Sequence, residues 1–163
     1  MSSVLLTLSS AAPYHLLSYG SLIGATLWHS FISSLIARKT LPRPQLGQLQ
    51  SKLFPIYFSL QTALSGICLL TTKNRNAQII FVIGIVGGLI NLIVFGPWTI
   101  KLMNKRFTME RDEGKQYNEP DISNQFKALN KQFGMVHGCS MMINMIIALS
   151  LVVYPFIVSL VVV

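Results

Sequence analysis

Charged side chains are scarce in this chain. Only 11% of the 163 residues are Asp, Glu, Lys or Arg, whereas 52% are hydrophobic, and the mean hydropathy is +0.55. Soluble domains carry roughly 25% charged residues. The shortage of charge therefore excludes an ordinary soluble domain and predicts a small integral membrane protein.

Acidic residues are the rarest charged group. Five Asp and Glu stand against thirteen Lys and Arg, which gives a formal net charge of +8. A basic excess can indicate nucleic-acid binding when the charges gather on one face. Here they lie in short segments between apolar runs, where the topology signals of membrane proteins occur. The pattern therefore indicates membrane orientation, and no nucleic-acid partner is predicted.

Several common motifs are missing. The chain has no Gly-rich phosphate loop, nucleophile elbow or HExxH motif, so no catalytic residues are assigned and a non-enzymatic protein is predicted. Residues 1–12 lack a basic segment and a long apolar core, so we expect the first span to act as its own insertion signal.

Cysteine is also scarce. Cys68 and Cys139 are predicted to differ in height within the membrane by roughly 16 Å, at about 1.5 Å per helical residue. A disulfide needs Cα atoms within about 7 Å. Both residues are therefore predicted to be unpaired, buried, small hydrophobic side chains.

Long apolar runs are abundant. A helix needs about 20 apolar residues to cross a hydrocarbon core of roughly 30 Å. The sequence predicts an all-α fold, a four-helix transmembrane bundle with cytosolic helical extensions. Residues 1–13 are predicted to form a short lumenal N-terminus and residues 14–163 the membrane domain. The predicted spans are residues 14–37, 53–72, 78–100 and 135–162.

Basic residues predict the orientation of these spans. The linkers 38–52 and 101–134 contain eleven Lys and Arg, whereas the opposite face has only Lys73 and Arg75. Positively charged loops stay in the cytosol. Both termini are therefore predicted to be lumenal, in the endoplasmic reticulum or a connected membrane.

The two cytosolic linkers have patterns of their own. Helical spacing of apolar residues in 101–134 predicts that the third and fourth helices both extend into this linker. A polar turn at 111–120 is predicted to join the two extensions, and Asp121 is predicted to cap the start of the fourth helix. In 38–52, a short interfacial helix is predicted from about Gln45, with Arg43 and Lys52 on anionic lipid headgroups. The alternative is that these charges only set topology. Pro55 is placed in the first turn of the second span.

Glycines mark candidate packing faces. Gly20 and Gly24 form a GxxxG pair in the first span, and packing inside one bundle is favoured over a dimer contact. Gly84, Gly87 and Gly88 are predicted to let the third helix approach its neighbours.

One polar side chain from each span is predicted to lie at a common depth, roughly 12–14 Å from the cytosolic edge. This intramembrane polar layer consists of His29, Gln61, Asn91 and Asn144. Thr26 and Ser33 are predicted to share the face of His29, and His137 and Ser140 that of Asn144. Two interpretations stay open: structural hydrogen bonds between helices, or a functional polar cavity.

Histidines raise a cofactor alternative. Imidazole suits iron, copper and zinc, so a haem- or copper-binding protein is the alternative function. The predicted heights argue against it, because His15 and His137 lie at opposite ends of the bundle. His29 and His137 differ in height by about 9 Å. No metal site is predicted.

Several short stretches resemble one family. The most specific is Gln50-Ser51-Lys52-Leu53-Phe54-Pro55. Weaker matches are His15 at the start of the first span and His137-Gly138 at the start of the fourth. Together they resemble the transmembrane protein 205 family. The resemblance implies a four-span endomembrane protein without implying an activity.

A more distant likeness to four-span copper-resistance and haem-binding families, which also open with a histidine, keeps the cofactor alternative open. The predicted function is a small transport, stress-response or trafficking factor.

Overall fold

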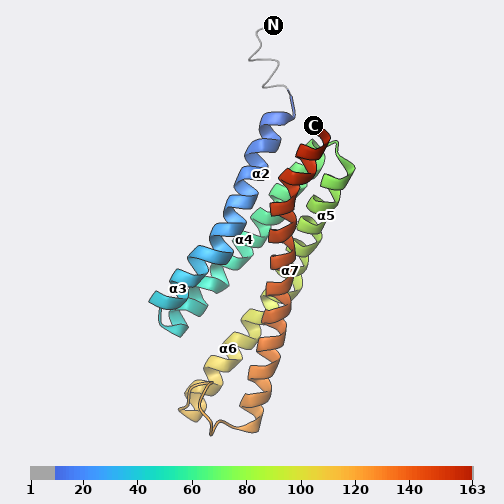
Figure 1. Cartoon of the computed structure of the whole chain (residues 1–163). Coiled ribbons are helices and arrows are strands. Elements are labelled where there is room, and N and C mark those ends of the chain that lie inside the picture. Colours follow the sequence, from blue (N-terminus) through green and yellow to red (C-terminus); the bar gives the residue numbers. More distant parts are fainter. Residues whose placement is uncertain (1–9, 163) are drawn as a thin grey trace.

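The fold is seen in a computed structural model that describes residues 10–162 of the chain, with side chains as far as Ser159 (Figure 1). The described residues are helical and contain no strand. In chain order the elements are α2 (Ala12–Leu27), η1 (Trp28–Ser33), α3 (Ser34–Thr40), α4 (Arg43–Thr71), α5 (Arg75–Ile90), η2 (Asn91–Phe95), α6 (Gly96–Glu113) and α7 (Asn124–Val162).

Four continuous rods are long and apolar enough to cross a membrane. They are Ala12–Thr40, Arg43–Thr71, Arg75–Glu113 and Asn124–Ser159. The two π-helical segments, η1 and η2, lie inside rods and do not break them. The predicted all-α four-helix transmembrane bundle is confirmed, and the protein is a multi-pass integral membrane protein. The start of α2 and the end of α7 lie at the same end of the bundle (Figure 1).

The predicted helical extensions are present at the other end. The third rod continues to Glu113, where Gly114 ends it with a left-handed φ of 63° that glycine adopts without strain. The polar turn therefore spans residues 114–123, three residues later in the chain than predicted and of the same length. The fourth rod begins at Asn124 and is capped by Ser123, whose Oγ accepts a hydrogen bond from the backbone N–H of Phe126 at 3.1 Å. The prediction that Asp121 supplies this cap is wrong.

The start of α4 also differs from the prediction. The segment after Gln45 is not a separate interfacial helix, because α4 runs unbroken from Arg43. Gly47 packs so closely on α6 that an added Cβ would lie 2.9 Å from Met103 Sδ. The early start also places Pro55 inside the helix rather than in its first turn. Its missing N–H therefore removes a bond from the helix interior.

The bundle is apolar outside and partly polar inside. Leu70 is 87% exposed and Leu17 71%, which suits helices that face lipid. The buried apolar core gathers towards the end that holds the start of α2. Its buried members are Leu22, Cys68, Ala77, Ile80, Phe81, Ile147, Leu151 and Tyr154.

Small residues pack on only one of the two predicted faces. A Cβ on Gly84 would lie 2.4 Å from Ser65 Oγ, so α4 and α5 are in close contact there. Gly20 and Gly24 are exposed, with nothing within 4 Å of an added Cβ. The expectation that this pair packs inside the bundle is wrong, because it faces outwards.

Both cysteines are free, as predicted. Cys68 is buried in the core, as expected. Cys139 is exposed, so the expectation that it is buried is wrong.

Candidate intramembrane polar site

A hydrogen-bonded network joins three rods inside the bundle. The Tyr57 hydroxyl donates to Asn144 Oδ1 at 2.8 Å and accepts from Gln61 Nε2 at 2.9 Å. Asn144 Nδ2 donates to Ser30 Oγ at 2.7 Å, and Gln61 Nε2 also reaches Thr26 Oγ1 at 3.4 Å. These five residues, from the first, second and fourth rods, are called the polar network below.

Two predicted members of the layer, Gln61 and Asn144, therefore meet directly, with Gln61 Nε2 lying 3.3 Å from Asn144 Oδ1. Gln61 is only 2% exposed. Its amide nitrogen Nε2 has three acceptors within hydrogen-bond distance, on Thr26, Tyr57 and Asn144. Its Oε1 is buried and has no hydrogen-bond partner among the described residues. Buried polar atoms are almost always paired, so this free acceptor marks a place where a hydrogen-bond donor would be stabilised.

His29 lies beside the network rather than in it. Its ring packs on Tyr57 with centroids 4.4 Å apart and on Phe54 at 5.3 Å with perpendicular planes. Its Nδ1 has one long contact, 3.5 Å from Ser33 Oγ, and its Nε2 is buried without a partner in the described chain. The imidazole is thus held by aromatic packing and keeps one ring nitrogen available.

Asn91 is separate from the other three layer residues. It is fully buried, and its Nδ2 donates to the backbone carbonyl of Ser140 at 3.3 Å. Asn91 therefore links the third rod to the fourth at Ser140, which lies one turn of α7 before Asn144. The Oδ1 of Asn91 is a second buried acceptor without a partner among the described residues.

Two of the four layer residues lie in π-helical turns. His29 is in η1 and Asn91 begins η2. The carbonyl of His29 accepts from the backbone N–H of Ser34 and from its hydroxyl at 2.6 Å. The carbonyl of Asn91 accepts from the N–H of Gly96. Short π turns inside α-helices occur often at functional sites, and here both coincide with the polar layer.

His15 belongs to a second cluster, at the end where α2 starts. The Thr71 hydroxyl donates to the Ile67 carbonyl at 2.7 Å, so it accepts from His15 Nδ1, also at 2.7 Å. The proton is then on Nδ1, and Nε2 accepts from the Tyr154 hydroxyl. His15 therefore joins α2, α4 and α7 and has both ring nitrogens engaged.

His137 lies near the opposite end, stacked on Phe133 with centroids 5.6 Å apart. The guanidinium of Arg106 lies over the rings of Phe133 and Tyr117, 4.3 Å from the Phe133 centroid and 4.6 Å from the Tyr117 centroid. Arg106 Nε also donates to Asn130 Oδ1 at 2.8 Å. This cluster fixes the extension of α6 against that of α7.

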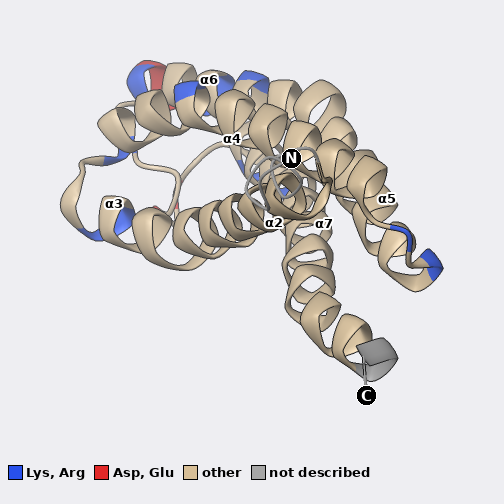
Figure 2. Cartoon of the chain, turned by 90° about the horizontal axis from the view of Figure 1, so that it is seen from above, with Lys and Arg blue, Asp and Glu red and all other residues tan. Residues whose placement is uncertain are grey.

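Arg43 contributes to the same end. Its guanidinium lies 3.8 Å from the Tyr117 centroid and forms a 2.7 Å ion pair with Glu110. Lys52 is exposed. Figure 2 shows Lys and Arg along α6 and α3, with a separate group at the start of α5. The contact of Arg43 and Lys52 with lipid headgroups stays a prediction, and Arg43 has protein partners in this structure.

The three histidines do not share one site in the described chain. His15, His29 and His137 lie in three different environments, and the described residues contain no group of three or more His, Cys, Asp or Glu that could hold a metal ion. No pair of histidines is therefore placed to bind a haem iron or a copper ion together.

The polar layer predicted from depth misses Tyr57 and Ser30. Tyr57 could have been found, because it lies one turn before Gln61 and shares its face. Ser30 could have been found in the same way, because it lies one turn after Thr26, which is predicted to share the face of His29. The π turn widens the helix, and Ser33 bonds back to the His29 carbonyl at 3.3 Å.

The residues of the Gln50–Pro55 motif lie in different environments and do not form one site. Phe54 packs on His29, as described above, and stacks on Phe58 with centroids 5.8 Å apart. Ser51 donates to the Gln48 carbonyl at 2.8 Å within α4. Lys52, Leu53 and Pro55 are exposed, and Gly138 has nothing within 4 Å of an added Cβ. Within this motif, the described side chain that reaches the candidate site is Phe54.

The fold and site define a small multi-pass membrane protein with a polar network inside its bundle. Residues 17–108, more than half of the chain, match the family described as Domain of unknown function (DUF4149), and the chain belongs to that family.

A curated relative is similar over part of its length. Xanthocillin biosynthesis cluster protein D from Aspergillus fumigatus is 41% identical over 75 residues, which are 46% of this chain and 46% of that protein. The match thus covers less than half of the relative. No solved structure matches this chain.

Proposed function

We propose that this chain is a non-enzymatic membrane component that holds a small hydrogen-bonding solute at the polar network and moves it within the membrane. The observation that carries the proposal is the presence of three buried polar atoms without a partner among the described residues, one in the network, one on His29 beside it and one on Asn91, which lies apart. Gln61 Oε1 and Asn91 Oδ1 can only accept hydrogen bonds, and His29 Nε2 can accept or donate. A small donor such as an alcohol, an amine or water fits these atoms.

The arrangement supports a binding site rather than an open pore. Along α7, the polar residues Ser140 and Asn144 are followed by Ile147 and Leu151, which are 1% and 0% exposed. These apolar side chains separate the polar network from the His15 cluster. A solute held at the network would need a rearrangement of this apolar layer before it could cross.

The cellular setting is part of the proposal. The eleven-to-two distribution of Lys and Arg supports cytosolic linkers and lumenal termini. With the resemblance to the transmembrane protein 205 family, it supports a place in the endoplasmic reticulum or a connected membrane. The relative named for a biosynthesis cluster supports a role close to small-molecule chemistry. A stress-response or trafficking role would use the same scaffold.

The test uses His29, whose imidazole Nε2 is buried without a partner in the described chain. His29→Asn keeps a polar group of smaller size, so we expect a folded protein that fails to complement a deletion phenotype. Thermal unfolding in detergent and complementation are measured together. Ser150→Ala is the control, because Ser150 is a half-buried intramembrane serine whose hydroxyl donates to the Ile146 carbonyl of its own helix.

The two measurements separate the two interpretations of the layer. Loss of complementation at unchanged stability supports the solute site. Retention of both properties in His29→Asn would leave the polar network as a structural device and would refute the proposed function.

A further inference from the structure

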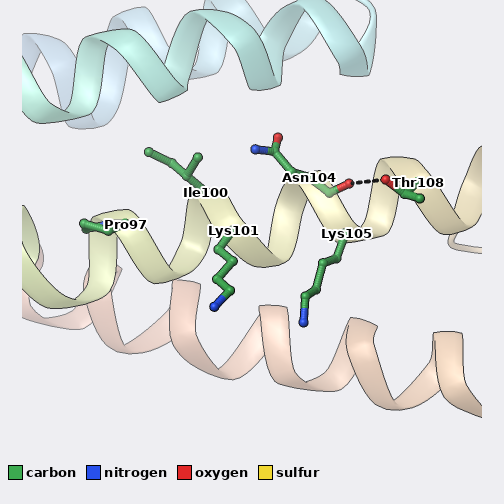
Figure 3. Close-up of a pocket in the computed structure, with 6 residues that line it drawn as sticks. All are labelled: Pro97, Ile100, Lys101, Asn104, Lys105 and Thr108. Atoms are coloured by element: carbon green, nitrogen blue, oxygen red, sulfur yellow. Dashed lines mark hydrogen bonds between the residues drawn. The ribbon is translucent and has the colours of Figure 1, made fainter.

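One face of α6, just after the third apolar run, carries a shallow and open depression. A groove of about 630 Å³ is lined by Pro97, Ile100, Lys101, Asn104, Lys105 and Thr108. In Figure 3, Lys101 and Lys105 extend together to one side of α6, and Ile100 and Asn104 extend to the other. The two ammonium groups are therefore presented as a pair, one helical turn apart.

The charge of this pair is not compensated by nearby acids. No acidic residue lines the groove, and neither lysine has an ion pair in the described part of the chain. The acids of α6 are engaged elsewhere: Glu110 with Arg43, Asp112 with Arg111, and Glu113 with Ser123. The groove therefore attracts an anion.

The position of the groove identifies the source of that anion. Pro97 and Ile100 end the third apolar run, and the lysines follow immediately. Trp98 is 43% exposed on the same helix, as is typical of an aromatic residue at the membrane interface. The apolar half of the groove thus faces acyl chains and the basic half faces headgroups.

We propose that this groove binds an anionic glycerophospholipid. Its phosphate lies between Lys101 and Lys105, and an acyl chain follows Pro97 and Ile100. Asn104 also borders the groove, on the side of α6 away from the two lysines. The site is distinct from Arg43, whose guanidinium is held by Glu110 and Tyr117. It depends neither on the proposed solute site nor on which face of the membrane is cytosolic.

The experiment measures lipid binding to the purified full chain in detergent by native mass spectrometry. Phosphatidylglycerol is compared with phosphatidylcholine of the same acyl chains. At about 1 kcal/mol for each lysine, Lys101→Gln with Lys105→Gln should weaken the Kd for phosphatidylglycerol about thirty-fold. Lys101→Arg with Lys105→Arg keeps both charges and should retain binding.

The matched control removes the same amount of charge, two positive side chains, at the other end of the bundle, where α4 is connected to α5. Lys73→Gln with Arg75→Gln should leave the Kd for phosphatidylglycerol unchanged. Equal losses in the two double variants would reduce the effect to net charge and overturn the site. Unchanged binding in Lys101→Gln with Lys105→Gln would do the same.

A second arm distinguishes a lipid from free phosphate. Inorganic phosphate and glycerol 3-phosphate are added as competitors at the phosphate concentration of the lipid. We expect the lipid to remain bound, because the apolar half of the groove contributes only to the lipid complex. Displacement of the lipid by inorganic phosphate at equal concentration would refute a lipid site.

Discussion

At the residue scale, the Tyr57 hydroxyl is a central group of the polar network, because it donates to Asn144 and accepts from Gln61. Tyr57→Phe removes both bonds and leaves the ring packing on His29 intact. Hydrogen bonds between membrane helices contribute about 0.6 kcal/mol each, so we expect a loss of about 1 kcal/mol in the free energy of unfolding. Thermal unfolding in detergent measures it.

Tyr14→Phe is the control for this change. Tyr14 is 54% exposed on the first rod, so its hydroxyl is free to bond to solvent or headgroups. Its removal should leave the midpoint of unfolding where it is in the parent chain. A Tyr57→Phe protein as stable as Tyr14→Phe would mean that the network adds nothing to the fold.

Residue depth was the informative signal in the sequence. It selected Gln61 and Asn144, which bond to each other, and it placed His29 next to them. Depth depends only on the rise of 1.5 Å per residue, which a boundary error changes little. The facing direction depends on the exact twist of each helix, and this is why Asn91 was placed in a group that it does not join.

At the element scale, η2 depends on a glycine. Gly96 donates to the Asn91 carbonyl, and a Cβ at this position would lie 2.7 Å from that backbone oxygen. Gly96→Ala should force the π turn to open and cost about 1–3 kcal/mol, as other overpacked sites do. Gly66→Ala, where nothing lies within 4 Å, should show no loss. Unfolding of the two variants under the same conditions provides the comparison.

The start of α7 gives a second pair of variants. Ser123 caps this helix, whereas no cap bond comes from the Asp121 side chain in the structure. Ser123→Ala should therefore fray the first turn and cost about 1 kcal/mol. Asp121→Ala should not. Hydrogen exchange of the Phe126 amide reports the difference, and equal exchange in both variants would contradict this assignment of the cap.

The same junction predicts a pH dependence. The hydroxyl and backbone N–H of Ser123 donate to the carboxylate of Glu113 and lower its pKa from the ordinary value. A lowered pKa means that the contact stabilises the folded junction above the ordinary Glu pKa and is lost as the pH falls through the lowered value. The protection factor of the Ser123 amide, which is its exchange rate relative to the intrinsic rate at the same pH, should therefore fall on acidification, and Glu113→Gln should abolish this pH response.

Element boundaries could be predicted only in part. The apolar runs marked the cores of the four rods, because the hydrocarbon thickness limits their length. The starts of α4 and α7 lie in polar sequence, where packing on other extensions decides the outcome. Gly47 on Met103 draws the first turns of α4 onto α6, and no periodicity within residues 38–52 contains that information.

At the scale of the whole molecule, the prediction concerns orientation. The start of α2 and the end of α7 lie at the same end of the bundle, which the charge distribution predicts to be lumenal. A tag after Val163 should therefore be protected from protease in sealed microsomes. A tag inserted in the turn after Gly114 should be digested. Detergent should expose both tags. Digestion of the C-terminal tag in intact microsomes would reverse the orientation and place the eleven Lys and Arg of the linkers in the lumen.

The two π turns make the polar site depend on the length of the chain as well as on its chemistry. Each turn accommodates a residue that an uninterrupted α-helix would place elsewhere. Loss of one codon within Trp28–Ser33 would let this segment close into regular α-helix, because a π turn holds one residue more than an α turn. The flanking helices would keep their register, so Thr26 would stay beside Gln61, whereas the widened turn that carries His29 and Ser30 would be lost. The smallest in-frame deletion would therefore change the polar site while it left the bundle around the site in place.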